Sequence, residues 1–126
     1  MPHVIVEYTD NLAARSDIQD LLTKIRQVLE NRSDTYPVGG IRVRAHEVSC
    51  YTIADGKEND AFVHTQFKIG KGRSEEVKQA TCEAIFDVMK THFEDLYQES
   101  YLALSLELEE FQHPTFKQNN IHGRFK

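Results

Sequence analysis

The chain has 126 residues and a mass of 14.6 kDa, which is the usual size of one compact domain. With 40% hydrophobic and 28% charged residues it can bury a core, and this composition excludes a globally disordered chain. A net charge of −5 excludes the basic footprint of a nucleic-acid binder, and no apolar run approaches the roughly 18 residues of a membrane span. No signal peptide is visible, so we expect a cytoplasmic protein that contacts neither nucleic acid nor membrane.

The first part of the chain predicts a strand followed by a helix. Residues His3 to Tyr8 are rich in β-branched side chains, which favour a short strand. Ser16 is a suitable N-cap, and Gln19 stands three positions later, so a capping box is expected to start a helix here. The helix carries an apolar stripe at helical spacing, which is formed by Ile18, Leu21, Leu22, Ile25, Val28 and Leu29.

A second strand is predicted from Ile41, because a polar turn and the breaker-rich residues 36–40 follow the helix. Successive side chains of a strand point to opposite faces of the sheet. One face of this strand is therefore expected to carry Ile41, Val43 and Ala45, and the other face Arg42, Arg44 and His46.

The second half of the chain repeats this order. After a polar loop at residues 55–60, a strand is expected at residues 62–69, and Ser74 is expected to cap a helix that continues to about Leu96. The apolar side of this helix is formed by Val77, Ala80, Ala84, Ile85, Val88 and Met89. A fourth strand follows, with leucine at positions 102, 104, 106 and 108. The polar tail from Gln112 is expected to be an irregular arm.

The element order, β-α-β and then β-α-β, predicts an α+β fold in a single domain of residues 1–126. Ala-Arg-Ser-Asp at residues 14–17 is similar to Gly-Arg-Ser-Glu at residues 72–75, which favours a tandem duplication. The units would span about residues 2–55 and 60–111, with a C-terminal arm at 112–126. Side by side they give a four-stranded mixed sheet with two helices on one face, and the other face is expected to pack on another subunit. A ferredoxin-like domain has the same element order and is the alternative.

Pro2 is the first candidate for chemistry. A small residue after the initiator methionine allows that methionine to be removed, which would leave Pro2 as a free secondary amine. A backbone amine has a pKa of about 7.7–8.0, and cationic or apolar surroundings lower it. An amine poised near neutral pH is suited to moving a proton at carbon. Because many chains begin with Met-Pro, this residue alone does not identify an enzyme.

Three arginines are candidates for binding an anionic substrate. Arg73 immediately precedes the cap of the second helix, where backbone N–H groups also attract anions. Arg42 and Arg44 lie two residues apart on one strand face, and a guanidinium binds a carboxylate through two parallel hydrogen bonds. Such groups near one base would suit a substrate with several carboxylates, and pairing with the acids of the chain is the alternative. The histidines and cysteines have no metal-binding spacing, so no metal site is predicted.

These features together resemble a known family. Pro2 at the start, Gly-Arg-Ser-Glu-Glu-Val-Lys at residues 72–78 and Ile-Arg-Val at residues 41–43 resemble the tautomerase superfamily and, within it, the 5-carboxymethyl-2-hydroxymuconate isomerases. The likeness covers essentially the whole chain. It implies two fused β-α-β units, assembly as a homotrimer, and no cofactor or metal. It also implies isomerisation of a carboxylated dienol, 5-carboxymethyl-2-hydroxymuconate, to its 2-oxo-enoate isomer in homoprotocatechuate (4-hydroxyphenylacetate) catabolism.

The resemblance also implies roles for individual residues. Pro2 matches the N-terminal base, Arg73 matches the arginine that binds a substrate carboxylate, and Arg42 matches the strand arginine that polarises the 2-oxo group. Arg44 is a rival of Arg42 for substrate binding. Arg15, which corresponds to Arg73 in the first unit, is expected to be structural. The alternatives to this function are a tautomerase-fold enzyme for a different oxo or enol acid and a non-enzymatic ferredoxin-like binding module.

Overall fold

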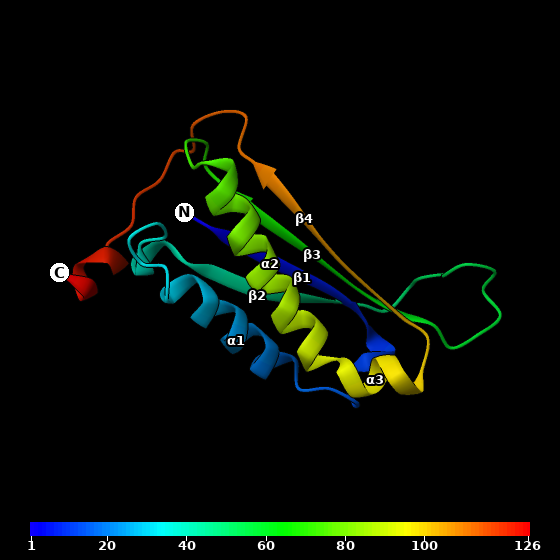
Figure 1. The fold of residues 1–126 in the computed structure, drawn as a ribbon. Helices are drawn as coiled ribbons and strands as arrows, with labels where there is room; N and C mark the ends of the chain where they lie inside the picture. Colours follow the sequence, from blue (N-terminus) through cyan, green and yellow to red (C-terminus); the bar gives the residue numbers. More distant parts are fainter.

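The computed structural model describes residues 1–126. Four strands form one sheet, and α1 (Ile18–Glu30) and α2 (Glu75–His92) pack together across one of its faces (Figure 1). The strands are β1 (His3–Thr9), β2 (Arg42–Val48), β3 (Ala61–Ile69) and β4 (Leu102–Glu110). The shorter elements are α3 (Glu94–Glu99) and the 3-10 turns η1 (Asp10–Leu12), η2 (Val38–Gly40) and η3 (Ile121–Phe125). The predicted α+β fold is confirmed. None of the helices has the length and apolar character that a membrane span needs.

The strand pairing shows how the two halves of the chain are joined. β1 pairs with β2 and β3 pairs with β4 in parallel, whereas β1 and β3 pair antiparallel at the centre of the sheet. The order across the sheet is β2-β1-β3-β4. Each half is therefore an unbroken β-α-β crossover. The ferredoxin-like alternative is wrong, because that arrangement splits its crossovers with another strand.

The strand directions bring distant segments to one end of the sheet. His3, the first residue of β1, pairs with Arg42 at the start of β2 and with Lys68 near the end of β3. Because β4 runs parallel to β3, the tail after β4 leaves from the same end. Figure 1 shows the N-terminus there, between the turn that follows β3 and the C-terminal tail (orange to red). Residues 49–60 and α3 lie at the opposite end of the sheet (Figure 1).

Apolar side chains fill the layer between the sheet and the helices. On the two central strands, the fully buried side chains of this layer include Val4, Val6, Val63 and Phe67. The two long helices contribute the fully buried residues Leu21, Ile25, Leu29, Ile85 and Met89. Each such side chain stabilises the fold by ~1.5–3 kcal/mol. Packing on the sheet, more than helix propensity, therefore fixes the positions of α1 and α2.

The start of α1 differs from the sequence prediction. Its N-cap is Asp17, whose carboxylate accepts a hydrogen bond of 3.0 Å from the backbone N–H of Asp20. Ser16 instead donates its hydroxyl to the carbonyl of Leu12 at 2.9 Å, which holds the turn before the helix. The predicted capping box of Ser16 and Gln19 is wrong, because serine and aspartate are comparable caps and the preceding turn uses the serine.

The second long helix begins as predicted but ends earlier. The hydroxyl of Ser74 accepts a 3.2 Å hydrogen bond from the backbone N–H of Val77, so Ser74 is the N-cap. The helix stops at His92 instead of Leu96, because Phe93 leaves the helical conformation and is fully buried. Ala80, predicted for the apolar side, is exposed. The buried residues of this helix are Lys78, Thr81, Ile85 and Met89.

The two polar residues on the buried side of α2 both have partners. The hydroxyl of Thr81 donates to the carbonyl of Val77 at 2.9 Å and accepts a hydrogen bond from the buried hydroxyl of Tyr36 at 2.9 Å. The ammonium of Lys78 lies 2.7 Å from the carboxylate of Glu75 and 3.5 Å from that of Glu110. Buried polar groups destabilise a fold unless they are paired, and these pairings make both positions acceptable.

The face of the sheet away from the helices is polar. Along β2 it carries the predicted side chains Arg42, Arg44 and His46. Along β4, at the other edge, it carries Glu107 and Glu109. Between these edges, the ring of His64 lies 2.6 Å from the hydroxyl of Ser105 and 3.1 Å from the carboxylate of Glu107. One edge of this face is therefore cationic and the other is acidic.

Candidate active site

Four segments meet at the end of the sheet where β1 begins. They are Met1 and Pro2, the η2 turn before β2, the loop of residues 70–73 and the C-terminal tail (Figure 1). Pro2 is buried, and its carbonyl accepts a 3.0 Å hydrogen bond from the backbone N–H of Arg42. The structure thus brings Pro2, Arg42 and Arg73 to one end of the sheet from three segments that are far apart in the sequence.

The N-terminal amine lies among positive charges. Partial burial lowers the pKa of the Met1 amine from its ordinary value of 8.0, and the charges of Lys117, Arg73 and Arg42 lower it further. A nearby cation disfavours the protonated form of an amine. The surroundings therefore favour the neutral amine, which is the form that can accept a proton.

Arg73 is fixed by the main chain around it. Its guanidinium donates to the carbonyls of Gly70 at 3.2 Å and Thr35 at 3.1 Å, and it lies 4.7 Å from the ring centroid of Tyr36. The Tyr36 hydroxyl is in turn held by Thr81. These contacts tie the loop before α2 to the segment after α1. The other N–H groups of the guanidinium, which has five in all, have no acceptor within the protein, and Nε is buried without a partner.

Arg42 and Arg44 have different surroundings. Arg42 donates to the carbonyls of Gly39 and Ile41, each at 3.1 Å, and its charge acts on the terminal amine. Arg44 is exposed, and its guanidinium lies 3.0 Å from Nδ1 of His3. Burial and the charge of Arg44 lower the pKa of His3. The structure therefore places Arg42 beside the amine and Arg44 beside His3.

Arg15 lies at the other end of the sheet. It follows β1, a strand of 7 residues, which corresponds to a length of ~20 Å. Its side chain is exposed, and the three cations that act on the terminal amine do not include it. Within one chain, Arg15 therefore takes no part in the cluster around the amine.

Sequence reasoning missed the contribution of the C-terminal tail. A cavity of about 430 Å³ opens beside Met1, and its wall includes Lys71 from the loop and, from the tail, residues 111–115 and Lys117. Among the cations, Lys117 has the largest effect in lowering the pKa of the amine. The one signal in the sequence is compositional, since no acidic residue follows Glu110 in a chain whose net charge is −5.

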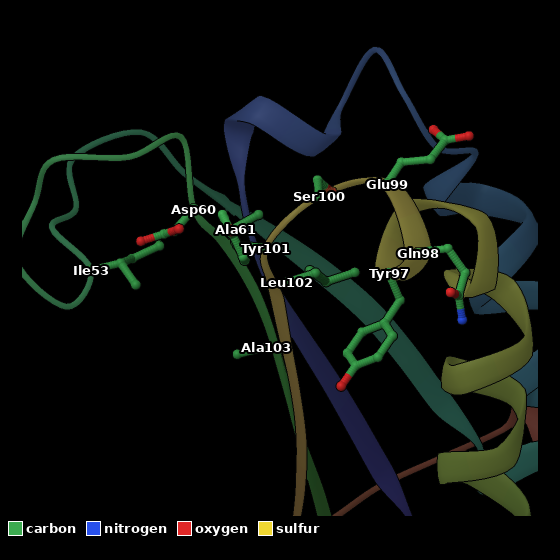
Figure 2. Close-up of a pocket in the computed structure, with 10 residues that line it drawn as sticks. All are labelled: Ile53, Asp60, Ala61, Tyr97, Gln98, Glu99, Ser100, Tyr101, Leu102 and Ala103. Carbon is green, nitrogen blue, oxygen red and sulfur yellow. The ribbon is translucent and has the colours of Figure 1, made fainter.

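A larger cavity of about 650 Å³ lies at the opposite end of the sheet (Figure 2). Its wall, at the start of β4 and the end of α3, includes Asp60 and Glu99 but no lysine or arginine. Carboxylates in the wall repel a carboxylate ligand, so the smaller cavity beside Met1 is better suited to an anionic substrate. At no point in the chain do three or more His, Cys, Asp or Glu side chains gather to hold a metal ion.

Solved structures with this arrangement identify the fold. A fused 4-OT described as a symmetric trimer has a TM-score of 0.59 and 20% identity, and the match covers 93% of this chain and 95% of that one. At this identity the likeness concerns the fold alone. Two β-α-β units joined by an antiparallel central pair give this chain a tautomerase-like fold.

Nearer relatives show the family. The family model for 5-carboxymethyl-2-hydroxymuconate isomerase matches residues 2–125. A 5-carboxymethyl-2-hydroxymuconate Delta-isomerase of Escherichia coli is 45% identical, and the match covers 100% of both chains. The crystal structure of a 5-carboxymethyl-2-hydroxymuconate isomerase from Deinococcus radiodurans R1 is 49% identical with a TM-score of 0.95, over 99% of this chain and 94% of that one. The chain therefore belongs to the 5-carboxymethyl-2-hydroxymuconate isomerase family, as the sequence resemblance predicted.

Proposed function

We propose that this protein catalyses the isomerisation of 5-carboxymethyl-2-hydroxymuconate, in the breakdown of homoprotocatechuate, with the amine of Pro2 as the general base. The observation that carries the proposal is that the amine of Met1, the residue before Pro2, lies among Lys117, Arg73 and Arg42, in a chain of the isomerase family. A cytoplasmic location is part of the proposal, and the two free cysteines, Cys50 and Cys82, support a reducing compartment.

The proposed reaction moves one proton and leaves the composition of the substrate unchanged. The neutral amine takes the proton of the 2-hydroxyl group, whose electrons form the 2-oxo group. The electrons of the diene shift along the chain, and the distant carbon at its other end receives a proton from the ammonium. Fixed cations stabilise the negative charge that develops on the 2-oxygen. We assign this role to Arg42, and carboxylate binding to Arg73, whose guanidinium is already oriented by two carbonyls.

Removal of Met1 is part of the proposal, because the nitrogen of Pro2 is an amide as long as Met1 is attached. The family match begins at Pro2. Met1 and the ring of His122 both lie near Gly40, since a Cβ built on Gly40 would lie 3.4 Å from Cγ of Met1 and 3.7 Å from Cε1 of His122. Without Met1, this space opens to the substrate beside the new terminal amine.

We also propose that the protein assembles as a homotrimer. The polar face of the sheet has a cationic edge at β2 and an acidic edge at β4, so a head-to-tail contact between copies brings opposite charges together, and such contacts close into rings. Large apolar side chains are also left exposed, namely Tyr97, Tyr101, Phe116 and Phe125. Native mass spectrometry should give a mass equal to that of three chains. A monomer with full activity would contradict this assembly.

An ultraviolet assay of 5-carboxymethyl-2-hydroxymuconate turnover tests the function and the base. The mature protein should weigh one methionine less than the encoded chain. Pro2→Ala, which replaces the secondary amine by a primary amine, should lower kcat at least about 10-fold, and a chain extended before Pro2, in which its nitrogen is an amide, should lose about 100-fold or more. Full activity of the extended chain would exclude Pro2 as the base. No turnover by the unmodified protein would refute the isomerase itself.

A further inference from the structure

The C-terminal tail crosses the active-site end of the sheet as a strap, which we define as residues 111–119. At its start, the backbone N–H of Phe111 donates to the carbonyl of Ile69 at 2.9 Å. At its other end, the side-chain amide of Asn119 donates to the carbonyl of Gly39 at 2.8 Å. Beyond this second tie, η3 packs against η2. The strap is thus held at both ends, and between its ties residues 112–115 and Lys117 line the cavity of about 430 Å³ beside Met1.

The charged side chain that the strap adds to this cavity is that of Lys117, a cation. His113 and Lys117 line it from the strap and Lys71 lines it from the facing loop, and its wall contains no aspartate or glutamate. Neither lysine forms an ion pair within the chain. Lys117 also lowers the pKa of the Met1 amine, next to Pro2, more than Arg73 or Arg42 does.

The hydrogen bond of Asn119 also connects the strap to Arg42, one of the site residues predicted from the sequence. The carbonyl of Gly39 accepts hydrogen bonds from both Asn119, at 2.8 Å, and Arg42, at 3.1 Å. One main-chain oxygen therefore holds the end of the strap and the guanidinium proposed to act on the 2-oxygen. The strap is therefore attached to the candidate active site, although it is part of neither β-α-β unit.

We propose that the strap completes the substrate site, and that Lys117 binds the carboxylate of the carboxymethyl branch while Arg73 binds another carboxylate. This inference rests on the proposed function and deepens it. The substrate carries three carboxylates, and its branch lies on the carbon that receives the proton from the base. A cation beside the base is therefore well placed to bind the branch. The strap would then select the branched tricarboxylate over a dicarboxylate that lacks the branch.

The test compares two substrates with a matched pair of variants. Lys117→Met removes the charge and keeps most of the length of the side chain. Lys57→Met makes the same change in net charge on the exposed loop at the opposite end of the sheet. Both are assayed with 5-carboxymethyl-2-hydroxymuconate and with 2-hydroxymuconate, which lacks the branch. Each assay is made on the plateau of the pH–rate profile, so that a change in the pKa of the base does not contribute.

Lys117→Met is expected to lower kcat/KM about 10- to 30-fold on the branched substrate, mainly through KM, and no more than about twofold on 2-hydroxymuconate. Lys117→Arg should restore most of the loss, and Lys57→Met should change neither value. Equal losses on the two substrates, or no loss from Lys117→Met in an active enzyme, would overturn the role of the strap alone. An unmodified protein inactive on both substrates would instead refute the proposed function.

Discussion

Replacing Arg73 by alanine is expected to destabilise the protein as well as weaken substrate binding. The change removes the hydrogen bonds from the guanidinium to the carbonyls of Gly70 and Thr35, and its contact with the ring of Tyr36. In a partly exposed site each hydrogen bond contributes about 0.5–1.5 kcal/mol and the ring contact about 0.5–1 kcal/mol. The two hydrogen bonds and the ring contact add up to a fall of about 1.5–4 kcal/mol in the free energy of unfolding.

Urea denaturation followed by far-ultraviolet circular dichroism measures this change, at one protein concentration because the stability of an oligomer depends on concentration. Arg15→Ala is the matched control, since Arg15 has the corresponding position before α1 but is exposed. In the activity assay, Arg73→Ala should raise KM at least about 10-fold with a smaller change in kcat. Equal denaturation midpoints for the two variants would refute the role of Arg73 in tying the loop to the segment after α1.

Three further predictions concern the terminal amine, His92 and Tyr36. Burial and nearby cations lower the pKa of the Met1 amine, and the same cations are expected to act on the amine of Pro2 once Met1 is removed. The kcat/KM should then rise to a plateau at lower pH than for an ordinary amine, and Lys117→Met should move this rise to higher pH. Burial lowers the pKa of His92 below 6.5, so the unfolded chain binds the proton more readily. Thermal stability should therefore fall as the pH drops below about 6.5, and less so in His92→Gln. Tyr36→Phe removes a hydroxyl that donates to Thr81 and should lower the urea-derived free energy of unfolding by about 1 kcal/mol. Its KM should stay unchanged, because the ring still lies against Arg73.

The apolar pattern predicted the elements because each strand and helix buries one face. The alternating leucines of β4 and the apolar stripe of α1 face the same core. The spacing of these apolar residues can be recognised from the local sequence alone. Details that depend on partners from other elements could not be predicted in this way. Besides its partner Glu75 on α2, the buried Lys78 has Glu110 on β4, and the buried Thr81 has Tyr36 from the segment after α1. The cap of α1 was missed for a local reason, since two suitable residues stand side by side.

The candidate site was predictable where its residues stand at the ends of regular elements. Arg42 starts β2 and Arg73 precedes α2, and the strand directions then bring both to the chain start. Lys117 lies in a segment without periodicity, and its position results from hydrogen bonds at Phe111 and Asn119 to residues far away in the sequence. Nothing local in the tail indicates those contacts.

The same topology explains why a fold of two similar units should have one active site per chain. The antiparallel central pair sets the start of β1 beside the loop before α2, and it sets the start of β3 beside the turn before α1 at the opposite end of the sheet. At that opposite end, Asp60 precedes β3 where Pro2 precedes β1, and Leu102 starts β4 where Arg42 starts β2. The cavity there (Figure 2) therefore lacks both the amine and the strand arginine. No substitution at residue 60 could restore the base, because a nitrogen within the chain is an amide, and only the end of a chain presents an amine.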